Sequence, residues 1–225
     1  MKKRTLTLLL ALGLLLTTPA LAAQEAAFSR IHTYHGQFSD LTADSVFYDN
    51  VSALYEYGLS VGQADGTFGL TDSLTVGQAV IFAGRIRSLY RTGDPEAGPN
   101  AYGGDGDASA ASRYLRYLQA EGVLDHALDD CLADTATRAQ MAHVLAEILP
   151  EEALPSAHDA LVTQAYASRK AITDVTEYTP YYQDILALYR KGVCAGVDET
   201  GSFRPDASIT RGAAAAMLTR MVGPA

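Results

Sequence analysis

The 225-residue sequence predicts a mainly α-helical protein built from three copies of one helix–turn–loop–helix unit. Three observations lead to this prediction: landmarks that recur at fixed spacing, apolar side chains at helical spacing, and threonines placed where a helix would begin. Internal similarity is tested first because a repeated unit decides how the whole chain folds.

The first and last copies share nearly every landmark. Phe38-Ser39-Asp40-Leu41 has a counterpart in Ile172-Thr173-Asp174-Val175, and each Asp lies 18 residues before a glycine, Gly58 or Gly192. A second glycine follows four residues later, Gly62 or Gly196, and then a loop that ends in Phe68 or Phe203. The middle copy lacks this loop and aligns with the other two on Gly122.

Each copy is predicted to begin with a helix that ends at its glycine. Positions 11, 7 and 4 residues before the glycine carry apolar or small side chains, and steps of four and three residues keep them on one helical face. The glycine stands where a left-handed C-terminal cap is expected. The three sets are Phe47, Val51 and Leu54; Ala111, Leu115 and Leu118; and Tyr181, Ile185 and Leu188.

A second helix is predicted after Thr75, Thr137 and Thr210, because a threonine hydroxyl at the N-cap accepts an otherwise unpaired backbone N–H. Apolar stripes at helical spacing follow each threonine. They are Ala79, Phe82, Ile86 and Leu89; Met141, Val144, Leu145 and Ile148; and Ala214, Met217, Leu218 and Met221.

One such helix pair is too small to bury its apolar face alone, so the copies are expected to share one core. The predicted repeats are residues 38–90, 110–149 (shortened) and 172–222. Residues 91–109 form a Gly-rich linker, and residues 150–171 form a second linker with a short helix over 156–169. Residues 23–37 precede the first repeat.

Residues 1–22 have the three-part layout of a secretory signal peptide. A basic start at residues 2–4 is followed by an apolar run over 6–16 and by Ala20-Leu21-Ala22, a small-x-small cleavage pattern. The run is too short to span a bilayer comfortably. We therefore expect an exported protein that is not inserted in the membrane after cleavage.

The charge and cysteine content exclude several functions. The net charge of the full chain is −9, and it becomes more negative once the basic leader is removed. Nucleic acid is therefore a poor partner, since phosphate binding needs a basic surface. Cys131 and Cys194 are too few for a disulfide framework or a zinc cluster; buried free thiols are favoured, with a single bridge as the alternative.

The ordered landmarks resemble the S-layer homology (SLH) repeat: Phe-x-Asp, a helix ending in Gly, Gly-x-x-x-Asp-Gly-Thr-Phe, and a Thr-Arg helix start. The resemblance implies three tandem repeats packed as a pseudo-threefold helical body. It also implies noncovalent attachment to a secondary cell-wall polysaccharide, often with acidic sugars, in grooves between repeats. The protein would then be secreted and lie at the cell wall or cell surface.

The resemblance places the glycan-binding residues at the helix starts and in the loops. They are Arg138, Arg211, Thr137, Thr210, Asp40, Asp174, Gly62 and Gly196. An Arg in the first turn of a helix is locally unfavourable, because the positive end of the helix dipole disfavours cations. Two explanations stay open: pairing with an anionic sugar, or pairing with a nearby carboxylate such as Asp134 or Asp206.

The sequence also departs from the family pattern. The Thr-Arg-Ala-Glu motif reads Thr-Val-Gly-Gln from Thr75, Thr-Arg-Ala-Gln from Thr137 and Thr-Arg-Gly-Ala from Thr210, so Arg is missing once and Glu three times. An alternative function is therefore a secreted interaction or assembly module that kept the scaffold, lost glycan recognition and binds another envelope protein.

Other motifs predict no further chemistry. Asp40 and Asp174 could also be simple turn or cap residues, and Asp65-Gly66-Thr67 is predicted to be a plain turn, since it lacks the acidic ligand pattern of a calcium loop. His32 and His35 have no third metal ligand nearby in the sequence. No catalytic motif is found, so neither an enzyme nor a cofactor is predicted.

Overall fold

The computed structural model describes residues 28–101, 109–154, 172–198 and 200–223. Within these ranges the protein is mainly helical and its only strand-like pairings are isolated bridges, which confirms the predicted fold class at that level. The helices are α2 (Tyr48–Glu56), α3 (Val76–Thr92), α4 (Ala97–Ala101), α5 (Ala110–Ala120), α6 (Arg138–Ala146), α8 (Tyr182–Arg190), α9 (Arg211–Val222) and the 3₁₀ turn η1 (Glu151–Ala153).

Helices α2, α5 and α8 form where the glycine-terminated helices are predicted. Their buried side chains include the pairs Val51 and Leu54, Leu115 and Leu118, and Ile185 and Leu188. The predicted caps are confirmed, because all three glycines adopt positive φ angles that other residues reach only with strain. These angles are 69° at Gly58, 71° at Gly122 and 71° at Gly192.

Helices α3, α6 and α9 begin at the predicted threonines. The hydroxyls of Thr75, Thr137 and Thr210 each accept a hydrogen bond from the backbone N–H three residues later. In α3 and α6 a glutamine side chain accepts from the threonine N–H in return, completing a capping box. Gln78 and Gln140 therefore replace the motif's glutamate without loss of the cap.

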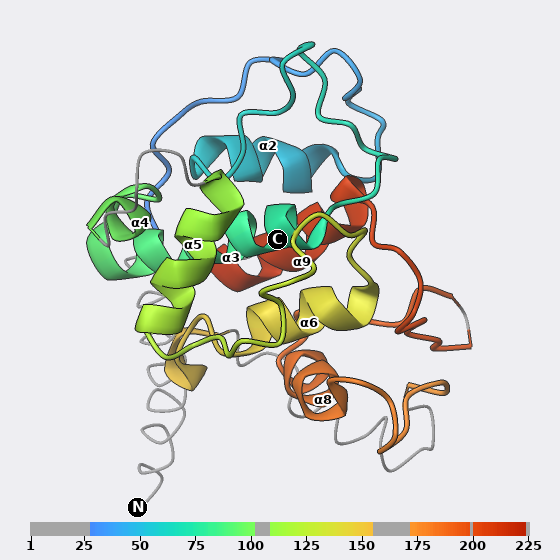
Figure 1. The fold of residues 1–225 in the computed structure, drawn as a ribbon. Helices are drawn as coiled ribbons and strands as arrows, with labels where there is room; N and C mark the ends of the chain where they lie inside the picture. Colours follow the sequence, from blue (N-terminus) through green and yellow to red (C-terminus); the bar gives the residue numbers. More distant parts are fainter. Residues whose placement is uncertain (1–27, 102–108, 155–171, 199, 224–225) are drawn as a thin grey trace, which may run out of the picture.

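The helices pack mainly between three segments of the chain, residues 38–90 (first), 110–149 (middle) and 172–222 (last), rather than within each segment. Helix α5 lies against α3, α8 against α6, and α2 against α9, while α3 also contacts α6. Figure 1 shows α3, α6 and α9 towards the middle of the molecule, with α2, α5 and α8 arranged around them. One continuous hydrophobic cluster runs through all these helices, so no segment holds its own separate core.

A closed ring of backbone hydrogen bonds joins the residues just before the three middle helices. The N–H of Leu74 donates to the oxygen of Ile209 (3.0 Å), that of Ile209 to Ala136 (3.0 Å), and that of Ala136 back to Leu74 (2.8 Å). Each buried residue thus gives one bond and receives one. The ring brings the starts of α3, α6 and α9 together and places the residues that follow them at matched positions.

The predicted linkers contain some ordered structure. Part of the first linker forms α4, which packs on α3: the N–H of Gly98 donates to the Ser88 hydroxyl at 2.8 Å, and Gly98 is buried. The second linker begins with η1. The predicted signal peptide and the short helix at 156–169 lie outside the described residues.

Cys131 and Cys194 are both free, as the favoured interpretation predicted, with Cys194 buried and Cys131 partly exposed. Within the part of the chain that the structure describes, no helix is long and apolar enough to cross a membrane.

Candidate functional site

Arg138 is buried at the junction between α6 and the loop before α9. Its Nε donates to the backbone oxygen of Phe203 at 2.6 Å, and its guanidinium carbon lies 4.7 Å from the centre of the Phe203 ring. Two backbone bonds hold the same contact, from Arg138 N–H to Ala207 and from Ala139 N–H to Pro205, both 2.9 Å. The side chain is therefore fixed by the neighbouring segment rather than by its own helix.

Arg211 makes the same set of contacts at the start of α9. Its Nε donates to the oxygen of Phe68 at 2.6 Å, and its guanidinium lies 4.8 Å from the centre of that ring. The backbone N–H of Arg211 donates to the backbone oxygen of Asp72 at 2.9 Å. The two arginines thus occupy matched sites, each made of a helix start from one segment and an aromatic loop from the next.

Neither guanidinium forms an ion pair with any carboxylate in the described ranges. Only 8% of Arg138 and 7% of Arg211 is exposed, and burial lowers the pKa of both side chains. The predicted alternative of pairing with Asp134 or Asp206 is not found among the ion pairs of these residues. The carboxylates of Asp174 near Arg138, and of Asp72 and Asp40 near Arg211, offset part of the effect of burial without forming an ion pair. A buried cation without a direct ion-pair partner is suited to binding an anion.

Asp40 and Asp174 hold the loops on which the arginines rest. The carboxylate of Asp40 accepts from the backbone N–H groups of Phe68 (2.6 Å), Gly69 (2.8 Å) and Leu70 (3.2 Å). Burial acts to raise the pKa of Asp40, but these three bonds outweigh it and keep the pKa below its usual value.

The corresponding Asp174 accepts from the N–H groups of Phe203 and Arg204, both at 2.7 Å. Both carboxylates are thus used within the protein, although neither is the local cap or turn residue of the alternative, since each accepts from a loop 28–30 residues further along the chain.

Gly62 and Gly196 permit close approaches inside the same loops. A Cβ at Gly62 would overlap the Phe38 ring and lie 2.7 Å from the Thr67 oxygen, and one at Gly196 would lie 2.7 Å from the Cα of Gly201. Together with the capping role of Thr137 and Thr210, these contacts give six of the eight predicted site residues a structural explanation. Of the eight, Arg138 and Arg211 are charged side chains that form no ion pair with the described residues.

The third junction, between the start of α3 and the loop before α6, has neither the arginine nor the phenylalanine of the other two. Val76 lies at the start of α3 and is fully buried. Its N–H donates to the backbone oxygen of Asp134 at 2.9 Å, which matches the backbone bonds of the two arginines. The loop it faces carries Asp130 seven residues before Thr137, where the other two loops carry Phe68 and Phe203. The missing Arg and the missing Phe therefore belong to one junction.

Sequence reasoning did not assign Phe68 and Phe203 to the site. Both are fully buried and both support an arginine from another segment. Their fixed spacing from Thr75 and Thr210 was visible in the sequence, but spacing alone does not show which arginine each ring meets.

The acidic loops form hydrogen-bonded turns. The Asp65 carboxylate accepts from the N–H (3.0 Å) and the hydroxyl (2.7 Å) of Thr67, and that of Asp198 accepts in the same way from Thr200 (3.1 and 2.6 Å). These bonds lower the pKa of both carboxyls. Among the described residues, no group of three His, Cys, Asp or Glu side chains is placed to hold a metal ion.

A family model for the S-layer homology domain matches two segments, residues 37–69 and 171–215, and leaves the middle segment unmatched. The chain is thus similar to this domain in two places. Such domains are generally anchoring modules for the cell wall and are not catalytic. No curated protein matches the chain.

Proposed function

We propose that the protein is exported and held noncovalently on the cell wall by an anionic secondary cell-wall polysaccharide. In this proposal residues 38–90, 110–149 and 172–222 are three S-layer-homology-like repeats arranged about a pseudo-threefold axis. The backbone ring of Leu74, Ala136 and Ile209 supports that arrangement, because each repeat contributes one equivalent residue to it. Two of the three junctions, those of Arg138 and Arg211, would bind the polymer.

The observation that carries the proposal is the pair of buried arginines without an ion-pair partner in the described part of the chain. Each guanidinium uses Nε to bond a backbone oxygen, which leaves its two terminal nitrogens for a ligand. A planar guanidinium held in this way presents parallel N–H donors that match a carboxylate. An acidic sugar would supply the missing counter-charge.

Cosedimentation with purified walls tests the proposal. The protein should pellet with intact walls, and this retention should be lost when the secondary polymer is stripped and bare peptidoglycan remains. Retention should fall in Arg138→Ala and in Arg211→Ala, and further in the double variant. Arg113→Ala is a matched control, since Arg113 is an exposed arginine on α5 away from both junctions.

Two results would reject the proposal. Equal retention on bare peptidoglycan would exclude the polymer as ligand, and full retention of the double variant would exclude the arginines. In the second case, crosslinking to a specific envelope protein would favour the alternative of an interaction module.

A further inference from the structure

The two arginine junctions differ in charge at the residue that follows the supporting phenylalanine. Arg204 stands there in the Arg138 junction and Gly69 in the Arg211 junction. The two positions match in structure, because the N–H of each donates to the aspartate that holds its loop, at 2.7 Å and 2.8 Å. Both also have a positive φ, 57° and 76°. One junction therefore has a cation where the other has no side chain.

The backbone conformation of Arg204 is one that glycine reaches more easily. A positive φ brings the Cβ of an L-residue too close to the backbone, so an arginine at this position is locally unfavourable. Among the described residues, only Tyr181 and Arg204 combine a side chain with a positive φ. An unfavourable residue in an exposed loop points to a role for its side chain.

A second matched position also differs in charge. The backbone oxygen that accepts the N–H of Arg211 belongs to Asp72, whereas the one that accepts the N–H of Arg138 belongs to Ala207. Asp72 is exposed, and its carboxylate accepts a hydrogen bond from Gln63 at 2.7 Å. The loop of the Arg211 junction thus has an acidic side chain where the other loop has a methyl group.

Arg204 is close enough to Arg138 for the two positive charges to interact. Burial is the main cause that lowers the pKa of Arg138, and the charge of Arg204 adds to it, while Asp174 acts in the opposite direction. Cys194 also lies nearby, but burial keeps it as a neutral thiol. Asp206, an exposed carboxylate further along the same loop, is not among the groups that act on Arg138.

The Arg211 junction has only negative neighbours among the described residues. Burial lowers the pKa of Arg211, and the carboxylates of Asp72 and Asp40 oppose that effect. An anionic ligand at this junction is repelled by the exposed carboxylate of Asp72. At the Arg138 junction the same ligand meets a second guanidinium.

A ligand can reach the buried arginines through their terminal nitrogens. The Nε atom of each bonds a backbone oxygen. The terminal nitrogens form no hydrogen bond with the described residues, and none of them is among the buried atoms that lack a partner. They are therefore open at the surface, although the rest of each side chain is covered.

The guanidinium of Arg204 is also available to a ligand. It pairs with Asp198 at 3.1 Å, and 60% of the Arg204 side chain is exposed. Exposed pairs of this kind contribute little to stability. Asp198 also accepts from the N–H and hydroxyl of Thr200 and from the N–H of Ser202. Its carboxylate therefore stays hydrogen-bonded when Arg204 turns towards a ligand.

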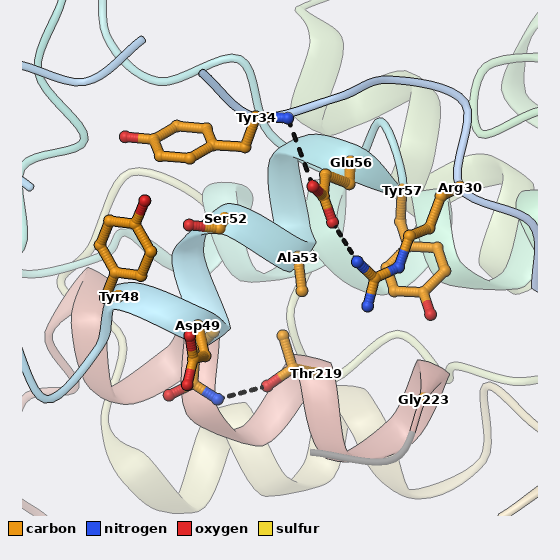
Figure 2. A pocket seen from close by; sticks show the side chains of 11 residues that line it. Arg30, Tyr34, Tyr48, Asp49, Ser52, Ala53, Glu56, Tyr57, Thr219 and Gly223 are labelled. Atoms are coloured by element: carbon orange, nitrogen blue, oxygen red, sulfur yellow. Dashed lines mark hydrogen bonds and ion pairs between the residues drawn. The ribbon is translucent and has the colours of Figure 1, made fainter. Parts of the chain in front are cut away.

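A pocket of about 390 Å³ beside α2 does not compete for an anion (Figure 2). It lies between residues 28–37, α2 and the end of α9, where Thr219 is part of the lining. Arg30 is the only cation among its lining residues, and it pairs with Glu56 of the same lining, as a dashed line in Figure 2 shows. Asp49 adds a further negative charge.

We propose that Arg204 is a further polysaccharide-binding residue, which makes the Arg138 junction the stronger of the two anion sites, while Asp72 weakens the Arg211 junction. This inference rests on the proposed function. An acidic group of the polymer bonds the terminal nitrogens of Arg138 and the exposed guanidinium of Arg204 together. At the other junction such a group meets one guanidinium and a carboxylate.

Cosedimentation with increasing amounts of purified wall gives a dissociation constant for each junction when the other is disabled. Arg211→Ala leaves the Arg138 junction and should bind more tightly than Arg138→Ala, which leaves the other. Adding Arg204→Gly to Arg211→Ala should weaken binding about threefold to fivefold, as expected for an exposed charge. Adding Asp72→Ala to Arg138→Ala should strengthen binding by a similar factor. Each change introduces the residue found at the matched position of the other loop.

Three further variants in the Arg211→Ala background separate charge from loop conformation. Arg204→Asn removes the charge with a residue that tolerates a positive φ, and should weaken binding as Arg204→Gly does. Arg204→Lys keeps the charge and should bind nearly as well as its parent. Arg113→Asn removes the same charge from an exposed site on α5, away from both junctions, and should leave binding unchanged.

Several results would overturn the proposal. Equal affinity of the two single-junction variants, or no loss in Arg204→Gly and Arg204→Asn, rejects it while polymer-dependent retention still supports the proposed function. An equal loss from Arg204→Gly in the Arg138→Ala background shows that Arg204 acts outside that junction, and also rejects it. Absence of polymer-dependent retention in the unmodified protein rejects the proposed function and this inference together.

Discussion

Arg138 rests on the ring of Phe203, although the two residues stand 65 positions apart and belong to different segments. Arg211 rests on Phe68 in the same way across 143 positions. Each site is therefore shared between two segments, and losing either half disables one junction only. This explains why the first segment can lack its Arg and the middle segment its Phe while two complete junctions survive.

Replacing Arg138 with Met should leave the free energy of unfolding within about 1 kcal/mol of the parent value, because the lost bond to Phe203 is offset by removal of a buried charge. Wall retention should nevertheless fall. Arg87→Met is the contrasting variant: Arg87 pairs with the partly buried Glu121 at 3.1 Å, so its loss should cost about 2 kcal/mol or more. Urea denaturation measures both, and equal losses would make Arg138 a structural residue.

Val76→Arg should destabilise the protein by about 3 kcal/mol or more, even though it restores the motif. Val76 is fully buried and faces a loop with Asp130, not Phe, at the matching position. The new guanidinium would have no ring to rest on. Thermal unfolding gives the answer, with Val76→Met as the size control, and a variant as stable as the parent would refute the pairing of Arg with the aromatic loop.

Asp40→Asn should cost about 1–3 kcal/mol at neutral pH, because an amide cannot accept all three backbone bonds. The pKa of Asp40 is lower in the folded than in the unfolded protein. Its contribution is therefore complete above the unfolded pKa and is lost as the pH falls through the folded pKa. The stability difference between parent and variant should shrink below about pH 4. A difference that stays constant down to low pH would contradict this.

Cys194 should resist alkylation in the native protein. It is 2% exposed, and burial raises its pKa to about 12, so its thiolate fraction is about a thousandfold smaller than that of an ordinary cysteine. Mass spectrometry after brief iodoacetamide treatment should find Cys131 modified first and both residues modified in denaturant. Native labelling of Cys194 at the rate of Cys131 would show that the core around it opens readily.

Much of the fold was predictable because the helix ends depend on interactions between residues that are close in the sequence. Thr75, Thr137 and Thr210 cap the helices because a hydroxyl at that position meets an unpaired N–H, and this depends only on neighbouring residues. The glycine caps are predictable for the same reason. The contact of Arg211 with Phe68 was not predictable, because it depends on which segment packs beside which.

The sequence was least informative about residues that fit both a structural role and a binding role. Asp40 and Arg211 both fitted a binding site by resemblance. Only the structure shows that the Asp40 carboxylate accepts three backbone bonds, whereas the Arg211 guanidinium forms no ion pair with the described residues. The pocket beside α2 gave no sequence signal, since Arg30 and Thr219 lie at opposite ends of the chain and no motif links them.

The backbone ring also sets the order of events in folding. Leu74 cannot complete its bonds until Ile209 is available, so two of the three bonds of the ring wait for a residue of the last described segment. Contacts of such long sequence separation form late and slowly. A chain made only as far as α6 would therefore have the Ala136–Leu74 bond alone, and the starts of the three middle helices would not yet be held together.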